Sequence, residues 1–257
     1  MKNMLFYIIC FALVITSCGE KNGPTENFVE ESKPSKKLSL DDRAKRYIED
    51  KLGINAAEEY HFESYRASIT ADTIVDGVFV VQRKSYTQKK VEDKGLEHSF
   101  KSNGFTAPEN YLFVYDAAKD KFVSTLPIAA NIKEDLKIEF IEFTSPAKND
   151  ISLVYHLSDG AFISFYSYAN EQLLQILNFP LYSDLGGENE VAYTYEFAPG
   201  SASLAKDVFI YKAELEYEKS KDFDPFTFEP KRIKTDELYL QFLFDPKRFK
   251  YVTPGFE

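Results

Sequence analysis

Between residues 60 and 252 the sequence consists of short runs rich in Phe, Tyr, Val and Ile, separated by residues that favour turns. In LKIEFIEF (136–143) apolar and charged residues largely alternate, which is the pattern of a strand with one buried face. SDG (158–160) joins two further runs in a sequence typical of hairpins. The chain contains 23 Phe and 17 Tyr residues, and both types suit a half-buried pleated surface. The sequence therefore predicts a mainly β, antiparallel body of about a dozen strands.

The runs fall into three groups of four, at 60–126, 136–179 and 191–252. Each group reads as a strand, a turn, an apolar strand opened by an acid, an aromatic strand and a short strand. The opening acids are Asp76, Asp150 and Asp207. Two explanations stay open: a true internal repeat of four-stranded units, or the periodicity that any antiparallel meander shows.

This layout resembles the repeats of FG-GAP and VCBS β-propellers, in which an acidic loop leads into an apolar strand. The resemblance implies propeller-like packing, with a sandwich as the alternative. Three units are fewer than the four to eight blades of propellers. The calcium loop of those repeats is also missing, because TADTIVDG, SPAKND and SASLAKD offer too few closely spaced oxygens for a Ca²⁺ site. We expect no bound calcium, no other metal and no cofactor.

Residues 1–17 have the composition of an export signal, with Lys2 followed by an uncharged apolar stretch at 4–17. As a helix, this stretch would span about 21 Å, which is short of the roughly 30 Å hydrocarbon core of a bilayer. It is therefore predicted to be a cleaved signal peptide and not a permanent membrane span.

The end of the leader, ITSC (15–18), resembles the lipobox of bacterial lipoproteins. The resemblance implies that Cys18 becomes the mature N-terminus and carries acyl chains that hold it in a bilayer. The alternative is a free thiol behind an ordinary cleavage site. Gly19 stands where some lipoproteins have an Asp that retains them in the inner membrane, so we expect the outer membrane. Which face of that membrane the protein occupies stays open.

Residues 18–38 are predicted to form a flexible tether, because they are rich in Lys, Glu, Pro, Asn and Ser. A single domain is expected over 39–257, opened by one amphipathic helix at 40–52. Ser39 is the predicted N-cap of this helix, and Gly53 its stop. We expect the helix to dock on its own domain, with binding of a partner as the alternative.

Two long connections, Ser85–Glu109 and Lys219–Glu237, lie at corresponding positions of the first and third groups. Long loops without regular structure are usually functional or disordered. Phe223, Phe226 and Phe228 stand among polar residues in the second loop, where they would form an exposed patch for a protein or glycan partner. Alternatively, they fold back as a lid over the core of the protein itself.

The formal charge of −10 opposes nucleic-acid binding and gives no overall attraction to an anionic membrane. The three histidines, His61, His98 and His156, lack the close spacing of a local metal motif. No G-x-S-x-G elbow, P-loop or G-x-G-x-x-G is present, and we expect no enzyme.

The expected function is therefore that of a membrane-anchored cell-envelope lipoprotein acting as a binding or interaction module. One alternative is a hydrolase acting on envelope polymers or glycans through paired acids, such as Glu188 with Glu190 or Asp222 with Asp224. Another is a purely structural component of the envelope.

Overall fold

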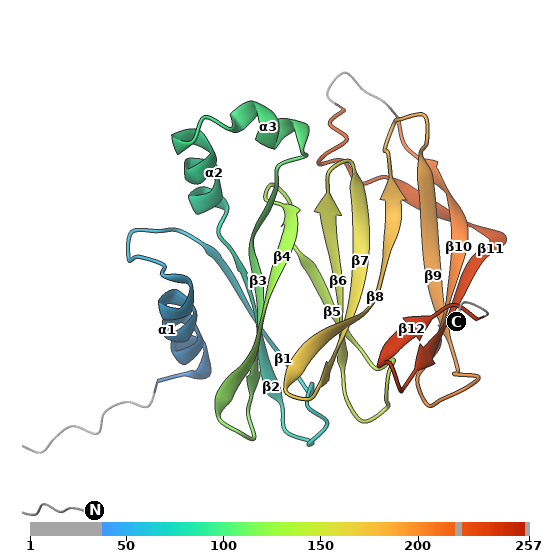
Figure 1. Ribbon diagram of the computed structural model, residues 1–257, viewed down its shortest axis with the longest axis horizontal. Helices are drawn as coiled ribbons and strands as arrows, with labels where there is room; N and C mark the ends of the chain where they lie inside the picture. The colour runs from blue at the N-terminus through green and yellow to red at the C-terminus, as the bar shows by residue number, and fades with distance from the viewer. Residues whose placement is uncertain (1–37, 219–222, 255–257) are drawn as a thin grey trace, which may run out of the picture. The chain divides into compact units, whose positions relative to one another are not determined.

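The computed structural model describes residues 38–218 and 223–254 (Figure 1). They belong to a compact body that begins at Leu38. The described residues form twelve strands and three α-helices, and neighbouring strands in each sheet pair antiparallel. This confirms the prediction of a mainly β antiparallel body.

The predicted N-terminal helix is confirmed as α1 (Leu40–Leu52). The Ser39 hydroxyl accepts the backbone N–H of Asp42 at 3.1 Å, which caps the first turn. Gly53 ends the helix with φ 61°, a conformation that costs glycine little. Ala44 and Ile48 are fully buried against the first sheet, so the helix docks on its own domain.

The strands form three consecutive groups, which we call units one, two and three. Unit one comprises β1 (His61–Ala67), β2 (Asp76–Gln82), β3 (Thr106–Asp116) and β4 (Lys121–Asn131). Unit two comprises β5 (Lys137–Ile141), β6 (Asp150–Leu157), β7 (Gly160–Ala169) and β8 (Gln172–Ser183). Unit three comprises β9 (Val191–Ala198), β10 (Asp207–Glu216), β11 (Lys231–Asp245) and β12 (Lys250–Val252). Unit one is a separate four-stranded sheet, whereas two residue pairs between β8 and β9 join units two and three into an eight-stranded sheet.

A shared hydrogen-bond pattern supports a true internal repeat. Asp76 opens β2 and accepts the backbone N–H groups of Ile69 and Thr70, at 2.9 and 3.0 Å. Asp150 opens β6 and accepts the N–H of Thr144, also six residues earlier, at 2.7 Å. The threonine hydroxyl donates to the same carboxylate in both units.

Unit three keeps the central feature of this pattern. Asp207 opens β10 and accepts the N–H of Ser201, again six residues earlier, at 3.1 Å. The residue before the aspartate also links neighbouring units. Asn149 donates its N–H to the carbonyl of Ser68 at 2.6 Å, and Lys206 donates to that of Phe143 at 2.7 Å. An incidental periodicity of strands would not reproduce these bonds.

The units pack face to face because side chains alternate along each strand. Val78 and Val80 of β2 pack against unit two, whereas Phe79 of the same strand packs under α1. Phe79 and Ile210 are equivalent residues, because each lies three positions after the aspartate that opens its strand. Ile210 packs against unit two. Helix α1 therefore takes the place that a preceding unit occupies elsewhere in the repeat.

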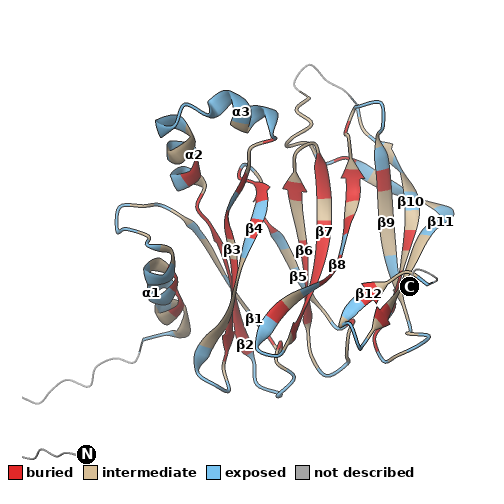
Figure 2. Cartoon of the chain, in the orientation of Figure 1, coloured by how far each residue is buried: buried red, intermediate tan, exposed pale blue. Residues whose placement is uncertain are grey.

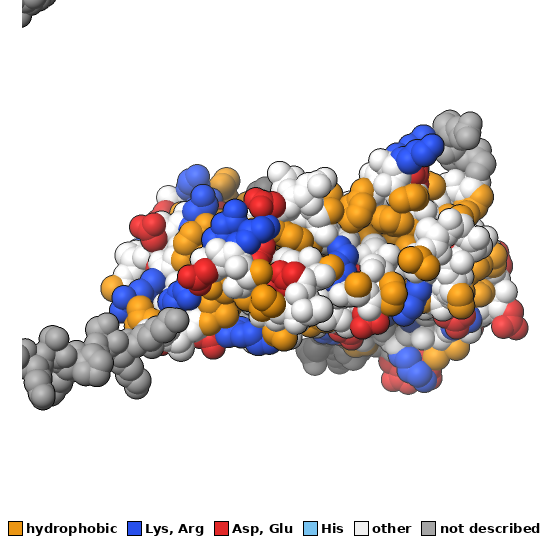
Figure 3. All heavy atoms as spheres, turned by 90° about the horizontal axis from the view of Figure 1, so that it is seen from below, with side chains coloured by type: hydrophobic (Ala, Val, Ile, Leu, Met, Phe, Trp, Pro, Cys, Tyr) orange, Lys and Arg blue, Asp and Glu red, His pale blue; other side chains and the backbone are white. Residues whose placement is uncertain are grey.

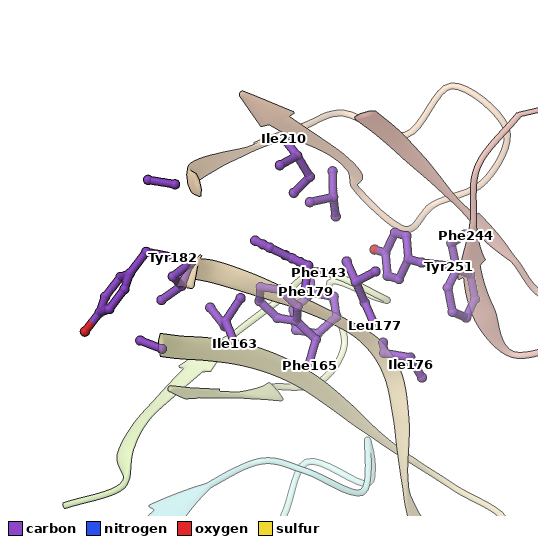
Figure 4. Packing of buried hydrophobic residues seen from close by; sticks show 14 of the residues in the cluster. Phe143, Ile163, Phe165, Ile176, Leu177, Phe179, Tyr182, Ile210, Phe244 and Tyr251 are labelled. Carbon is purple, nitrogen blue, oxygen red and sulfur yellow. The ribbon is translucent and has the colours of Figure 1, made fainter. Parts of the chain in front are cut away.

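The core between units two and three is strongly aromatic (Figure 4). Phe165 is fully buried, and its ring lies 5.1 Å from that of Phe143 and 5.6 Å from that of Tyr195, both edge-on. Tyr251 and Phe244 of unit three close the same cluster. Edge-to-face aromatic pairs add about 0.5–1.5 kcal/mol each beyond the area that they bury.

The outer face of unit three carries ion pairs between its own charged side chains, beside the exposed Ile233, Leu238 and Tyr239. Lys234 pairs with Glu196 at 2.5 Å and lies 3.8 Å from the ring centroid of Tyr211. Lys212 forms an ion pair with Glu237 beside it. Terminal repeats of stacked proteins need such a polar outer face to stay soluble.

The connections lie at two opposite ends of the body (Figure 1). The upper end carries the segment between β2 and β3 and the segment between β10 and β11. The lower end carries the loops 68–75, 142–149 and 199–206. Helix α1 begins at this lower end, where Arg43 pairs with Asp120 of the β3–β4 turn at 2.7 Å.

Two expectations for the first long connection are wrong. Ser85–Glu109 is not a loop without regular structure, and α1 is not the single helix, because α2 (Lys84–Asp93) and α3 (Glu97–Ser102) lie there. Neither helix has the apolar stripe that would have indicated it. The second connection is also shorter than expected, because β11 begins at Lys231.

Candidate functional site

The α2–α3 segment at the upper end adds little to the core of the protein. Thr87 is the one buried residue of α2, and α3 has none. Figure 2 shows α3 as exposed or intermediate along its length. Ordering two helices costs conformational entropy, and these helices bury few side chains in return. This segment is therefore the first candidate for an interaction site.

Arg83 fixes the base of α2. Its guanidinium donates to both carboxylate oxygens of Glu58, at 2.5 and 2.6 Å, and to the carbonyl of Leu52 at the end of α1, at 3.1 Å. The ring of Tyr86 lies 3.9 Å from the guanidinium carbon. The side chains of the pair are only 6% and 8% exposed, and the hydrogen bonds to Glu58 raise the pKa of Arg83. Such bidentate pairs are geometrically rigid.

An apolar hollow of about 240 Å³ lies where α2, α3 and the end of β4 meet. Its apolar lining is formed by Val91, Phe100, Phe105 and Ile132. Its rim is polar and includes Gln88, Glu92, Glu97 and Lys133. The Lys133 ammonium lies 3.5 Å from the ring centroid of Phe105, so a cation borders the apolar surface.

The two long connections contact each other at this end. The ring of Phe226 lies edge-on to that of Phe105 at 6.2 Å. The Asn131 side-chain amide donates to the carbonyl of Phe226 at 2.6 Å. Gly104 lies so close to the β6–β7 turn that an added Cβ would stand 2.5 Å from the Cα of Ser158, so glycine is required there. The two connections therefore meet at the same end of the body, as the sequence predicted, and form one surface there.

The three phenylalanines of the second connection are half-buried. Phe223 and Phe228 pack against the core of units two and three, with rings 5.4 Å apart and the Tyr217 ring beside both. Phe226 packs on the first connection instead. Phe223 and Phe228 therefore lie as the alternative predicted, folded back over the core of the protein itself. A direct role of the three residues in binding a partner stays a prediction.

His156 of β6 lies beneath the second connection and is 5% exposed. Burial lowers its pKa, the Glu229 carboxylate opposes this shift, and the Lys137 ammonium reinforces it. The Tyr182 ring packs edge-on at 6.2 Å. The surroundings therefore favour the neutral imidazole.

We expect acid to destabilise the protein through His156. Above pH 6.5, the ordinary pKa of His, the imidazole is neutral in both the folded and unfolded states. As the pH falls below 6.5, the unfolded chain takes up the proton first, because the folded pKa is lowered. The loss of stability continues as the pH falls, and it ends once the pH is below the pKa of His156 in the folded protein. Urea unfolding from pH 7.5 downward should show a smaller loss in His156→Gln than in the native protein, whereas His98→Gln, at an exposed site, should follow the native curve.

A second hollow of about 570 Å³ lies between α2 and the segment before β1. Carboxylates at its wall come from Glu58, Glu59 and Asp93. Both oxygens of Glu58 are bonded to Arg83, so Glu58 is not available as a general acid or base.

Two of the four acids that the sequence offered for hydrolysis have structural partners, and a third, Glu188, is exposed at the surface. Glu190 accepts the N–H of Gly186 and the hydroxyl of Tyr217. Asp224 accepts the N–H of Phe226. Asp222 lies outside the described residues. Within residues 38–218 and 223–254, no group of three His, Cys, Asp or Glu side chains is placed to hold a metal ion.

The predicted lipidation site, Cys18, lies outside the described residues, as do the leader and most of the tether. In the described part of the chain, no helix has the length and apolar character needed to span a membrane. No protein-family model, curated protein or solved structure matches the chain.

Proposed function

We propose that this protein is a lipid-anchored cell-envelope lipoprotein whose β body binds a protein partner through its upper end. The anchor is proposed from ITSC at 15–18, which supports acylation of Cys18. The binding role is proposed from one observation, the apolar hollow formed by the α2–α3 segment.

The size and lining of the hollow favour a protein partner. At about 240 Å³ it falls below the roughly 300–1,000 Å³ of sites that enclose small molecules. It has room for one or two apolar side chains of another protein, with Phe100 and Val91 as the contacting walls. A polar rim around an apolar centre is the usual anatomy of a protein interface. Glycans present mainly hydroxyl groups, which match the polar rim better than the apolar centre.

Replacing the wall of the hollow should abolish partner binding. A charge introduced by Phe100→Asp would be desolvated on binding, so we expect roughly 30-fold weaker affinity or more, the scale of an interface hot spot. The partner is identified by cross-linking the native lipoprotein in cells, followed by mass spectrometry. Its affinity is then measured with purified native and variant proteins.

The matched control is His98→Asp, an exposed position of α3 outside the lining, which should bind the partner like the native protein. Circular dichroism must show that both variants are folded. Equal partner affinity for Phe100→Asp and the native protein would contradict the binding proposal. Intact mass of the membrane-extracted protein tests the anchor separately, and an unmodified Cys18 would contradict it.

A further inference from the structure

The most exposed large apolar side chain of the described residues is Leu204, at 86%. It projects from the lower-end loop 199–206 of unit three. The backbone on both sides of it is held in place, because Ser201 donates its N–H to Asp207 and Ala205 is buried. The loop thus presents an aliphatic side chain to solvent from an ordered support.

Basic side chains lie on the same loop as this leucine and on the adjacent segment that includes the β11–β12 turn. The exposed ones are Lys206, Lys247, Arg248 and Lys250. The two segments that carry them are adjacent, because the Tyr251 hydroxyl donates to the carbonyl of Lys206 at 2.7 Å. Asp245 is the partly exposed acid of the same turn, and it lies 3.5 Å from Arg248. In a chain of net charge −10, these two segments carry four exposed cations and one partly exposed acid, and the neighbouring loop adds the exposed Glu142.

The chain also enters the body at the lower end. Leu38, 39% exposed, lies just before the N-cap of α1, and the first turn of this helix lies beside the β3–β4 turn. Cys18 lies 20 positions before Leu38. Ile74 and Val75, in the equivalent loop of unit one, are 45% and 55% exposed. Figure 3 views this end and shows hydrophobic side chains gathered over units two and three.

We propose that the lower end of unit three docks on the surface of a bilayer with anionic headgroups, with Leu204 entering the acyl boundary. The inference rests on the proposed anchoring of Cys18. Lysine and arginine around an aliphatic side chain match this surface, because the cations contact phosphates while the aliphatic group leaves water. The site is a projecting loop tip rather than a hollow, which suits a planar, deformable partner. Docking would turn the α2–α3 hollow away from the membrane.

The test measures how deeply each end of the acylated protein lies in a membrane. Ala202→Cys places a fluorophore beside Leu204, and His98→Cys places one at the upper end. The protein is purified from native membranes and reconstituted in vesicles of phosphatidylcholine with phosphatidylglycerol that contain quencher-bearing lipids. We expect lipid quenching of the probe at 202 and not at 98. Removing two charges, Lys206→Gln with Lys250→Gln, should lower the docking equilibrium constant roughly 25-fold, at about fivefold per charge.

The matched control is Lys89→Gln with Lys94→Gln, which removes two exposed lysines at the upper end and should leave quenching unchanged. Equal access of aqueous iodide to the probes at 202 and 98 would overturn the proposal. Lipid quenching of the probe at 202 that is equally strong in vesicles of phosphatidylcholine alone would also overturn it. So would a probe at 202 that neither lipid quencher nor iodide reaches, because this would indicate an acidic protein as the docking partner. Intact mass of the same preparation reports the state of Cys18, so failure of the anchor is distinguished from failure of docking.

Discussion

Asp76→Ala should cost about 3–5 kcal/mol of the free energy of unfolding. The carboxylate is fully buried and accepts three backbone N–H groups, from Ile69, Thr70 and Ala117, together with the Thr70 hydroxyl. Alanine would leave these donors without an acceptor, and each unsatisfied buried donor costs about 1–3 kcal/mol. Chemical denaturation of the native and variant proteins measures the difference.

The equivalent residue of unit three provides the matched control. Asp207 accepts the N–H of Ser201, so Asp207→Ala should cost less, about 1–3 kcal/mol. Asp76→Asn keeps one acceptor oxygen and should fall between the two alanine variants. Equal losses for Asp76→Ala and Asp207→Ala would show that the number of satisfied donors does not set the cost.

Glu58→Ala should cost a similar amount, about 3–5 kcal/mol. It would leave the Arg83 guanidinium, 6% exposed, without its carboxylate partner. Removing one member of a buried ion pair is costly because the remaining charge stays desolvated. Because Arg83 also bonds the end of α1, we expect loosening at both α1 and the base of α2. Urea denaturation gives the cost, and amide hydrogen exchange locates the loosening.

The neighbouring Glu59→Ala is the control, since this residue is exposed and should change stability by less than about 0.5 kcal/mol. Replacing both partners, as Glu58→Met with Arg83→Met, should recover part of the loss, because no isolated charge remains. If Glu58→Ala unfolded at the same urea concentration as the native protein, the Glu58–Arg83 pair would contribute no stability.

Local signals in the sequence predicted local structure well. Helix α1 was predictable because Ser39 and Gly53 act on the backbone next to them, whatever the rest of the chain does. The prediction of about a dozen strands followed from alternation and turn residues in the same way. The repeat stayed open at that level, because alternation alone occurs in any meander. The bond from Asp150 to the residue six positions earlier, shared by Asp76 and Asp207, provides the evidence.

The candidate site was much less predictable. Val91, Phe100, Phe105 and Ile132 are scattered over two helices and two strand ends, so no spacing in the sequence unites them. Their one signal was the unusual length of the Ser85–Glu109 connection. The sequence indicated the aromatic residues at 223–228 instead, although Phe223 and Phe228 pack mainly over the core. Burial depends on neighbours from other units, and the pattern within a loop does not contain that information.

The charged side chains on the outer face of unit three help to explain how three units can form a stable body without closing into a ring. A propeller hides its sheet faces by closing into a ring, which fixes the number of blades geometrically. Here α1 covers the outer face of unit one, and charged side chains such as Lys234 and Glu196 lie on the outer face of unit three, so neither face depends on ring closure. The number of units in such an assembly is then set by what covers its two end faces.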